Sequence, residues 1–189
     1  MSEEKRLRVV PVTITDARAH VARWHSHLGP PVGGLLASAV AEGDRIVCVA
    51  ILGRPVSRVL QAQGCAEVTR VASDGTVPHA ASMALGAIRK AALALGWRRL
   101  VSSTLLGEAG TSYRAAGWHP VALGDGGEWA REDRPRDASA QPGGKVRWET
   151  GPDALPLDSA ADAALREAVG RVAFAPRPEP ELPLFDSPR

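Results

Sequence analysis

Cysteines and aromatic residues are scarce in this sequence. The chain of 189 residues has two cysteines and 4% aromatic residues, against 44% hydrophobic residues overall. Cys48 and Cys65 lie in apolar, strand-like stretches without metal-ligand spacing, so we expect two buried free thiols rather than a disulfide or a metal site. The core is expected to consist mostly of alanine, valine, leucine and isoleucine. The length and hydrophobic content of the chain predict one domain.

Long apolar runs are also missing. No stretch approaches the roughly 20 residues that are needed to span a membrane. The N-terminal residues, MSEEKRLRVV, contain no apolar signal-peptide core. We therefore expect a cytoplasmic protein that has no membrane partner.

Charge is nearly balanced over the whole chain, at +2, but it is unevenly distributed. Residues 1–147 carry 19 Lys/Arg against 13 Asp/Glu, whereas residues 148–189 carry 4 against 8. A basic body permits an anionic ligand such as a coenzyme phosphate or nucleic acid, and it is equally compatible with an ordinary solvated surface.

The hydrophobic pattern predicts alternating strands and helices, with a hairpin at residues 42–44. This order is typical of an α/β (α+β) fold with a mixed sheet and helices on both faces. Helices are expected at 15–29, 82–96 and 110–117. Strands are expected at 6–14, 33–42, 44–56, 66–73, 97–106 and 118–123, with late strands at 126–132 and 145–149.

The composition changes near residue 150. We expect a catalytic domain over residues 1–149, followed by an acidic, Pro-rich extension over residues 150–189. The pattern of the extension predicts one amphipathic helix at 158–174 and then a disordered tail.

Three motifs lie within residues 8–123: EVTRVASDG followed by a small-residue helix, the hairpin DRIVCVAILGRP, and EAGTSYRAAGWHPV. Through these motifs the chain resembles the GNAT acyltransferase superfamily. The resemblance implies a mostly antiparallel central sheet and a group transferase. More narrowly, RWHSHLGPPVGG, VAILGRPVSR and EVTRVASDG are similar to a phage- and prophage-associated branch that includes the Mom enzymes, which modify the exocyclic amine of adenine in DNA.

The loop before the small-residue helix is the expected cofactor site. In the family this loop carries paired glycines whose backbone binds the pyrophosphate of acetyl-coenzyme A, but here Gly75 stands alone. The donor therefore stays open between acetyl-CoA and another acyl or aminoacyl donor. A helix start suits a phosphate, and Ser82 or Thr76 could cap it. We expect Ser73, Gly75, Thr76, His79 and Ser82 to contact the donor.

Glu67 and Arg70 lie on the strand that enters this loop. Glu67 could act as a general base toward an amine if burial raised its pKa, and Arg70 could hold a phosphate or carboxylate. Strict alternation would place Glu67 and Thr69 on one face of the sheet and Arg70 on the other. A strand-edge ion pair is the alternative.

Tyr113 occupies the position from which the resemblance implies a general acid toward the leaving thiolate. Packing in the core is the alternative for this single tyrosine. Ser102, Ser103 and Thr104 end the preceding strand, where the family leaves backbone groups free to bond a substrate or cofactor. We expect Ser103 to contact the donor and Thr104 to contact the acceptor, unless both simply form a polar strand end.

Four further residues are candidates for acceptor binding. His25 and His27 have a spacing that would let them bind a metal on an extended segment, but a third ligand is missing, so we predict substrate contact and no metal. Arg54 and Arg58 flank a loop and could contact a nucleic-acid backbone.

The C-terminal tail contains a possible docking peptide. Residues 181–185, ELPLF, are similar to the pentapeptide by which bacterial proteins bind the replication sliding clamp, with Glu where Gln is usual. Such a peptide suits a disordered carrier, and chance occurrence in a Pro- and Leu-rich tail is the alternative. The candidate contacts are Glu181, Leu182, Pro183, Leu184 and Phe185.

Three functions are compatible with these features. The first is modification of the exocyclic amine of a DNA base, which requires the base to leave the helical stack. The second is acetyl-CoA-dependent N-acetylation of a small amine or a protein. The third is a non-catalytic adaptor that associates with DNA or the clamp. The polar residues around the expected cofactor loop favour an enzyme over an adaptor.

Overall fold

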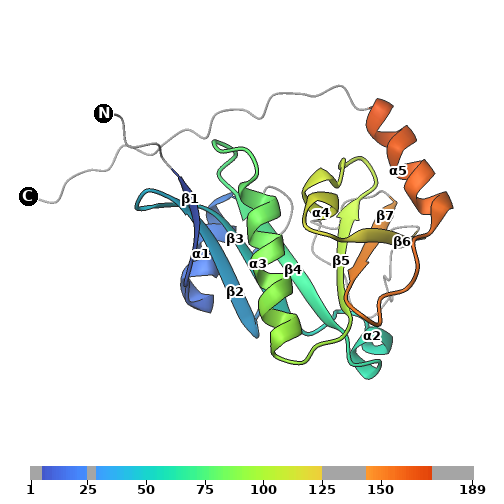
Figure 1. The fold of residues 1–189 in the computed structure, drawn as a ribbon, viewed down its shortest axis with the longest axis horizontal. Coiled ribbons are helices and arrows are strands. Elements are labelled where there is room, and N and C mark those ends of the chain that lie inside the picture. Colours follow the sequence, from blue (N-terminus) through green and yellow to red (C-terminus); the bar gives the residue numbers. More distant parts are fainter. Residues whose placement is uncertain (1–5, 25–28, 125–143, 172–189) are drawn as a thin grey trace, which may run out of the picture.

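A computed structural model describes residues 6–24, 29–124 and 144–171, which contain seven strands and five helices (Figure 1). The strands are β1 (Leu7–Val10), β2 (Leu36–Glu42), β3 (Arg45–Gly53), β4 (Ala66–Ser73), β5 (Leu100–Leu105), β6 (His119–Gly124) and β7 (Lys145–Thr150). The helices are α1 (Ile14–Trp24), α2 (Arg58–Ala62), α3 (Ala80–Ala94), α4 (Thr111–Ala115) and α5 (Ser159–Arg171).

The strands form one sheet in the order β1-β2-β3-β4-β5-β7-β6. All neighbouring pairs are antiparallel except β4 and β5, which are parallel. Helices α1 and α3 cover opposite faces of the sheet (Figure 1). The predicted mixed, mostly antiparallel sheet with helices on both faces is therefore confirmed.

The ladder between β4 and β5 is short. It joins Ala66 to Leu100, Glu67 to Val101 and Val68 to Ser102. Beyond this last pair, β4 stays with β3 and β5 stays with β7, and the two strands do not pair with each other within the described part of the chain. Their facing edges thus diverge and leave backbone N–H and C=O groups without ladder partners.

A β-bulge lies where this divergence begins. On β3, Ile51 pairs with Arg70 and Leu52 pairs with Val68, so Thr69 is an extra residue on β4. A bulged strand bends locally and twists more strongly. The bulge therefore accounts for the departure of β4 from its parallel neighbour directly after Val68.

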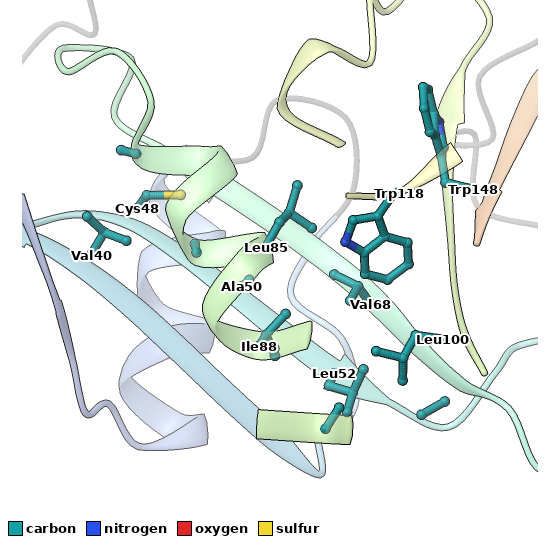
Figure 2. Close-up of a cluster of buried hydrophobic side chains, with 14 of the residues drawn as sticks. Val40, Cys48, Ala50, Leu52, Val68, Leu85, Ile88, Leu100, Trp118 and Trp148 are labelled. Atoms are coloured by element: carbon teal, nitrogen blue, oxygen red, sulfur yellow. The ribbon is translucent and has the colours of Figure 1, made fainter. Parts of the chain in front are cut away.

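The larger of the two hydrophobic clusters lies between α3 and the sheet. Leu85 and Ile88 of α3 pack onto side chains of the central strands such as Leu52 and Val68, while Trp118 fills the end nearest β5 (Figure 2). A smaller cluster packs α1 against the other face through Ala17, Val21, Val49, Ile51 and Ala72. The two clusters identify the face on which each strand residue lies.

Several expectations are refined by the structure. Cys48 and Cys65 are buried free thiols, as expected. The short helix α2 was not expected, and the expected strand at 126–132 lies outside the described residues. Helix α5 begins one residue after the expected start and buries Ala161 and Leu165 on the domain. No helix of the described residues has the length and apolar character to cross a membrane.

Gly110 permits close packing of α4 on β7. Its φ is +63°, and a Cβ there would lie 2.1 Å from Cζ2 of the fully buried Trp148. We expect Gly110→Ala to lower the free energy of unfolding by about 1–2 kcal/mol, because alanine is strained in the left-handed backbone conformation, and by about 1–3 kcal/mol more through overpacking against Trp148. Urea denaturation measures this free energy. Gly43→Ala, with φ +58° and no atom within 4 Å, should show the backbone part alone; equal losses would contradict the packing argument.

Candidate functional site at the divergence of strands β4 and β5

Tyr113 places its hydroxyl at the point where the strands diverge. The hydroxyl lies 2.8 Å from Oγ of Ser102, which is the last β5 residue paired with β4. Ser102 itself donates to the carbonyl oxygen of Val68 at 2.9 Å. Because the single Ser102 proton is used on that carbonyl, Tyr113 is the donor in the bond between the two hydroxyls. The phenolic proton is thus held at the apex.

Two tryptophans fix the Tyr113 ring. Trp148 stacks on it at 5.2 Å between centroids, and Trp118 meets it edge-on at 5.8 Å. Burial raises the pKa of Tyr113 to about 12, helped by the negative charges of Glu108 and Glu67 and opposed by the bond to Ser102. The phenol therefore keeps its proton at neutral pH and can serve as a donor, the form that a general acid requires.

Glu67 lies on the other face of the sheet, one residue before Val68. Its carboxylate accepts a hydrogen bond from the backbone N–H of Val56 at 2.8 Å. Burial raises the pKa of Glu67, although this N–H and the charges of Arg70 and Lys145 counteract part of the rise. A carboxylate with a raised pKa is a stronger base than a solvated one, which suits proton abstraction from an amine.

The predicted facing of Arg70 was wrong. The bulge at Thr69 adds one residue, so the alternation shifts and Arg70 pairs with Ile51 on the α1 face. Glu67, which pairs with Gly53, is on that same face. Arg70 donates to the carbonyl oxygens of Gly29 and Thr69 at 2.9 and 2.6 Å. It thus connects β4 to the chain that precedes β2 and brings positive charge to Glu67.

The loop between β4 and α3 is closed by its own side chains. Ser73 accepts from the N–H of Gly75 at 3.1 Å, and Asp74 accepts from the N–H of Thr76 at 2.9 Å. Arg45 of β3 forms an ion pair with Asp74 and donates to the Thr76 hydroxyl. Two loop N–H groups are therefore already bonded, and the charge of Asp74 is balanced by Arg45.

The predicted capping of α3 was also wrong. The N-cap is His79, with a left-handed φ of 66° and no side-chain cap. The Ser82 hydroxyl lies inside the first turn and donates to the His79 carbonyl oxygen, while Thr76 precedes the cap by three residues. The first N–H groups of α3 are therefore not capped by a side chain and point out of the helix start.

The two expected contacts on β5 lie on different faces. Thr104 is buried, and its hydroxyl accepts from Nε1 of Trp148 at 3.0 Å. Ser103 is exposed and pairs in register with Arg147 on the face of Glu67. Arg54 follows the Gly53 partner of Glu67 and is exposed, as is Arg58 at the start of α2. The contact of Ser103 with the donor stays a prediction, and so do the contacts of Thr104, Arg54 and Arg58 with the acceptor.

Some predicted residues fall outside the described part of the chain. His25 and His27 belong to residues 25–28, and Glu181, Leu182, Pro183, Leu184 and Phe185 belong to the last 18 residues. Among the described residues, no group of three or more His, Cys, Asp or Glu side chains could hold a metal ion.

Sequence reasoning missed the charged residues that β7 adds to this region. Lys145, Arg147 and Glu149 alternate on one face, whereas Val146 and Trp148 point into the core with α3. Glu149 is fully buried and is held by Arg99 through bonds of 2.8 and 2.7 Å. The alternation in KVRWET was the available signal, but the place of β7 beside β5 was not readable from the sequence.

No family model and no curated protein matches the sequence. Solved structures do match. An acetyltransferase of Bacillus subtilis in complex with CoA has a TM-score of 0.52 at 12% identity, covering 77% of this chain and 97% of its own. The ribosomal-protein-S18-alanine N-acetyltransferase of Escherichia coli has a TM-score of 0.54 at 10% identity, covering 82% and 98%.

A third match has a different acceptor. The polyamine N-acetyltransferase of Drosophila melanogaster, which forms N-acetylagmatine, has a TM-score of 0.50 at 10% identity, covering 77% of this chain and 100% of its own. Proteins with this architecture thus act on acceptors as different as a protein and a polyamine, and identities this low establish the architecture alone. The chain has the fold of the GNAT acetyltransferases.

Proposed function

We propose that this protein is an N-acetyltransferase that uses acetyl-CoA to acetylate a primary amine. The observation that carries the proposal is the constellation at the divergence of β4 and β5. A protonated Tyr113 hydroxyl and the raised-pKa carboxylate of Glu67 lie on the two faces of the sheet beside the last paired residues. An acid and a base at one gap between strands suit transfer of an acyl group to an amine.

The residues of the site fit an acyl-CoA donor in two respects. The facing edges of β4 and β5 offer backbone hydrogen-bonding groups beyond Val68 and Ser102, which suit the amides of an extended ligand. The uncapped first turn of α3 offers N–H groups to a phosphate. Since Ser73 and Asp74 already hold the N–H groups of the loop, the phosphates would be held by the start of α3, near His79 and Ser82.

The chain's own groups would handle the protons of the reaction. When bound, acetyl-CoA supplies the activated acetyl group and a thiol leaving group. Glu67 takes a proton from the ammonium or amine of the acceptor, and this proton transfer leaves the carboxyl neutral. Tyr113 presents its phenolic proton at the apex, where a developing thiolate needs stabilisation. The Glu67 carboxylate and the Tyr113 hydroxyl lie on opposite faces of the sheet, so the base and the acid do not compete for the same proton.

The experiment that tests the proposal measures donor binding and turnover. Calorimetric titration of the full chain with acetyl-CoA should show saturable binding, and addition of primary amines should release thiol. Ser82→Glu should weaken binding roughly tenfold or more, because a carboxylate in the first turn of α3 repels phosphate. Thr15→Glu makes the same change in the first turn of α1 and should leave affinity unaltered. Absence of both binding and thiol release would refute the proposal.

Modification of a DNA base is the second candidate. Positively charged side chains near Glu67, namely Arg70 and Lys145, would suit a phosphate of the acceptor strand. The N-acetyltransferase interpretation is favoured because the neighbours named above act on amines of other kinds. Mass spectrometry of nucleosides from cells that express the protein, compared with a Glu67→Ala variant, distinguishes the two. Clamp docking through residues 181–185 stays a prediction that the same cells can test by co-purification.

A further inference from the structure

We infer that the acceptor is a small amine that also carries an acidic group, a carboxylate or a phosphate, which is recognised by Lys145 and Arg147 on the face of Glu67. This inference rests on the proposed N-acetyltransferase activity and specifies its substrate class. It is carried by the order of side chains across three neighbouring strands and by an excess of positive charge among them.

The strand register places these residues on one face. Glu67 pairs with Val101, and Val101 pairs with Glu149 of β7. Within β7, Arg147 and Lys145 lie two and four residues before Glu149, so all three point to the same side. Trp148, between them, packs on the opposite side with Tyr113. The cationic side chains of β7 therefore share the face on which Glu67 would receive the amine.

Glu149 cannot neutralise Arg147 fully, because Arg99 already occupies it. Arg99 donates to both carboxylate oxygens of Glu149, and the N–H of Leu155 bonds to one of them at 3.0 Å. Arg147 Nε approaches Glu149 to 3.2 Å, yet this buried nitrogen has no hydrogen-bond partner. Two guanidinium groups thus share one carboxylate. Arg147 keeps donors and positive charge for a further anion.

Glu67 is itself surrounded by positive charge. The charges that act on its carboxyl belong to Arg70 and Lys145. Glu108 accepts a hydrogen bond from the N–H of Leu105, and its charge is not among those that act on the Glu67 carboxyl. A diamine acceptor would bring a second positive charge against Lys145 and Arg147, whereas an acid-bearing amine would find a partner there.

The span of the site suits a short bifunctional molecule. Two strand spacings, roughly 10 Å, separate β4 from β7, and Arg147 lies two residues, roughly 7 Å, along the strand from the level of Glu67, so the two Cα atoms are roughly 12 Å apart. The side chains of both residues extend over part of that distance. An amine at Glu67 and an anion at Arg147 could therefore belong to one small molecule. We favour such a compound over a DNA strand because Glu67 and Arg147 lie on the same face of the sheet, within the reach of one small molecule.

A matched set of three amines tests the inference. The probes are 6-aminohexanoate, its amide 6-aminohexanamide, and 1,5-diaminopentane, and ligand-observed NMR titration of the full chain measures their dissociation constants with and without acetyl-CoA. We expect the acid to bind at least about tenfold more tightly than the amide, and the diamine to bind most weakly. With turnover, the values of kcat/KM should follow the same order.

Charge-removing variants localise the effect. The double change Lys145→Gln and Arg147→Gln should reduce the preference for the acid over the amide to about threefold or less, since both cations are lost. Arg8→Gln removes an exposed arginine that pairs with Asp44 at the far edge of the sheet, and the preference should persist. Circular dichroism verifies that each variant is folded.

Several outcomes would overturn the inference. These are equal binding of acid and amide, tighter binding of the diamine, no binding of any probe, or a preference that survives in the folded double variant. Displacement of the acid by a single-stranded oligonucleotide that binds more tightly would assign the cationic face to DNA instead. Equal kcat/KM values for the acid, the amide and the diamine would refute this inference and leave the acetyltransferase proposal standing. Preferential binding of the acid by a protein that does not bind acetyl-CoA would refute the acetyltransferase proposal alone.

Discussion

Replacing Glu67 by glutamine is expected to lower kcat/KM for acetyl transfer by roughly 10²–10⁴-fold, the usual contribution of a positioned general base. The amide oxygen can still accept the N–H of Val56, which the carboxylate accepts at 2.8 Å in the wild type. The variant therefore keeps the local structure and loses the ability to take a proton. The initial rate of thiol release at saturating acetyl-CoA, with the amine concentration varied, measures the loss.

The pH dependence of the same variant has a defined sign. Burial raises the pKa of Glu67 in the folded state, so the neutral form is favoured and folding loses stability as pH rises through that raised pKa. Glutamine has no charge to bury. The Glu67→Gln protein should therefore match or exceed the wild type in urea denaturation at neutral pH, and their difference should vanish in acid.

In the wild type, kcat/KM should rise as the pH increases through the raised pKa of Glu67. This rise should be absent from the pH profile of Glu67→Gln. Asp44→Asn serves as a control, since Asp44 is a fully exposed carboxylate in the β2–β3 turn, and its rate and profile should equal those of the wild type. A Glu67→Gln enzyme with an unaltered rate would mean that the amine reaches the site already deprotonated.

Tyr113→Phe is expected to lower kcat by roughly 10²-fold or more, because the proton donor at the apex is removed. Phenylalanine keeps the ring that stacks on Trp148 and meets Trp118 edge-on. Ser102 keeps its own bond to Val68, so the ladder still ends at the same place. The dissociation constant of acetyl-CoA, measured by calorimetry, should consequently change little.

A second substitution separates proton donation from positioning. Ser102→Ala leaves the Tyr113 proton in place but removes the group that orients it, so kcat should fall less than in Tyr113→Phe. If the two variants lost the same activity, the hydroxyl would serve only to hold Ser102 and the strand ends. A wild-type kcat in Tyr113→Phe would show that water protonates the thiolate.

Most of the regular structure was predictable because periodicity and turn residues are local signals. The hairpin at residues 42–44, the strand before the cofactor loop and the helix after it all agree with the structure. Helix α2 was missed because it has five residues and is marked mainly by its N-cap Ser57. The bulge at Thr69 was missed because VTRVAS alternates acceptably with or without an extra residue.

The site was predictable in its chemistry and less so in its geometry. Glu67 and Tyr113 were predicted as catalytic residues from their residue types and the family resemblance, and these roles stay predictions. Their separation onto two faces, and the position of Ser102 between Val68 and Tyr113, depend on pairing between segments that are distant in sequence. The same holds for Arg45 and Asp74, which are 29 residues apart, and for the contribution of β7 beside Glu67.

The extra residue on β4 implies that a regular sheet without the bulge at Thr69 would not form the candidate site. Without Thr69, every remaining residue from Glu67 to Ser73 could keep its partner on β3 and its face. The straightened strand would run on beside β5, and the open backbone groups would pair with each other. Such a chain would gain backbone hydrogen bonds but lose the divergence of β4 and β5 that forms the candidate site. Insertions and deletions in β4 should therefore disrupt this site more than substitutions do.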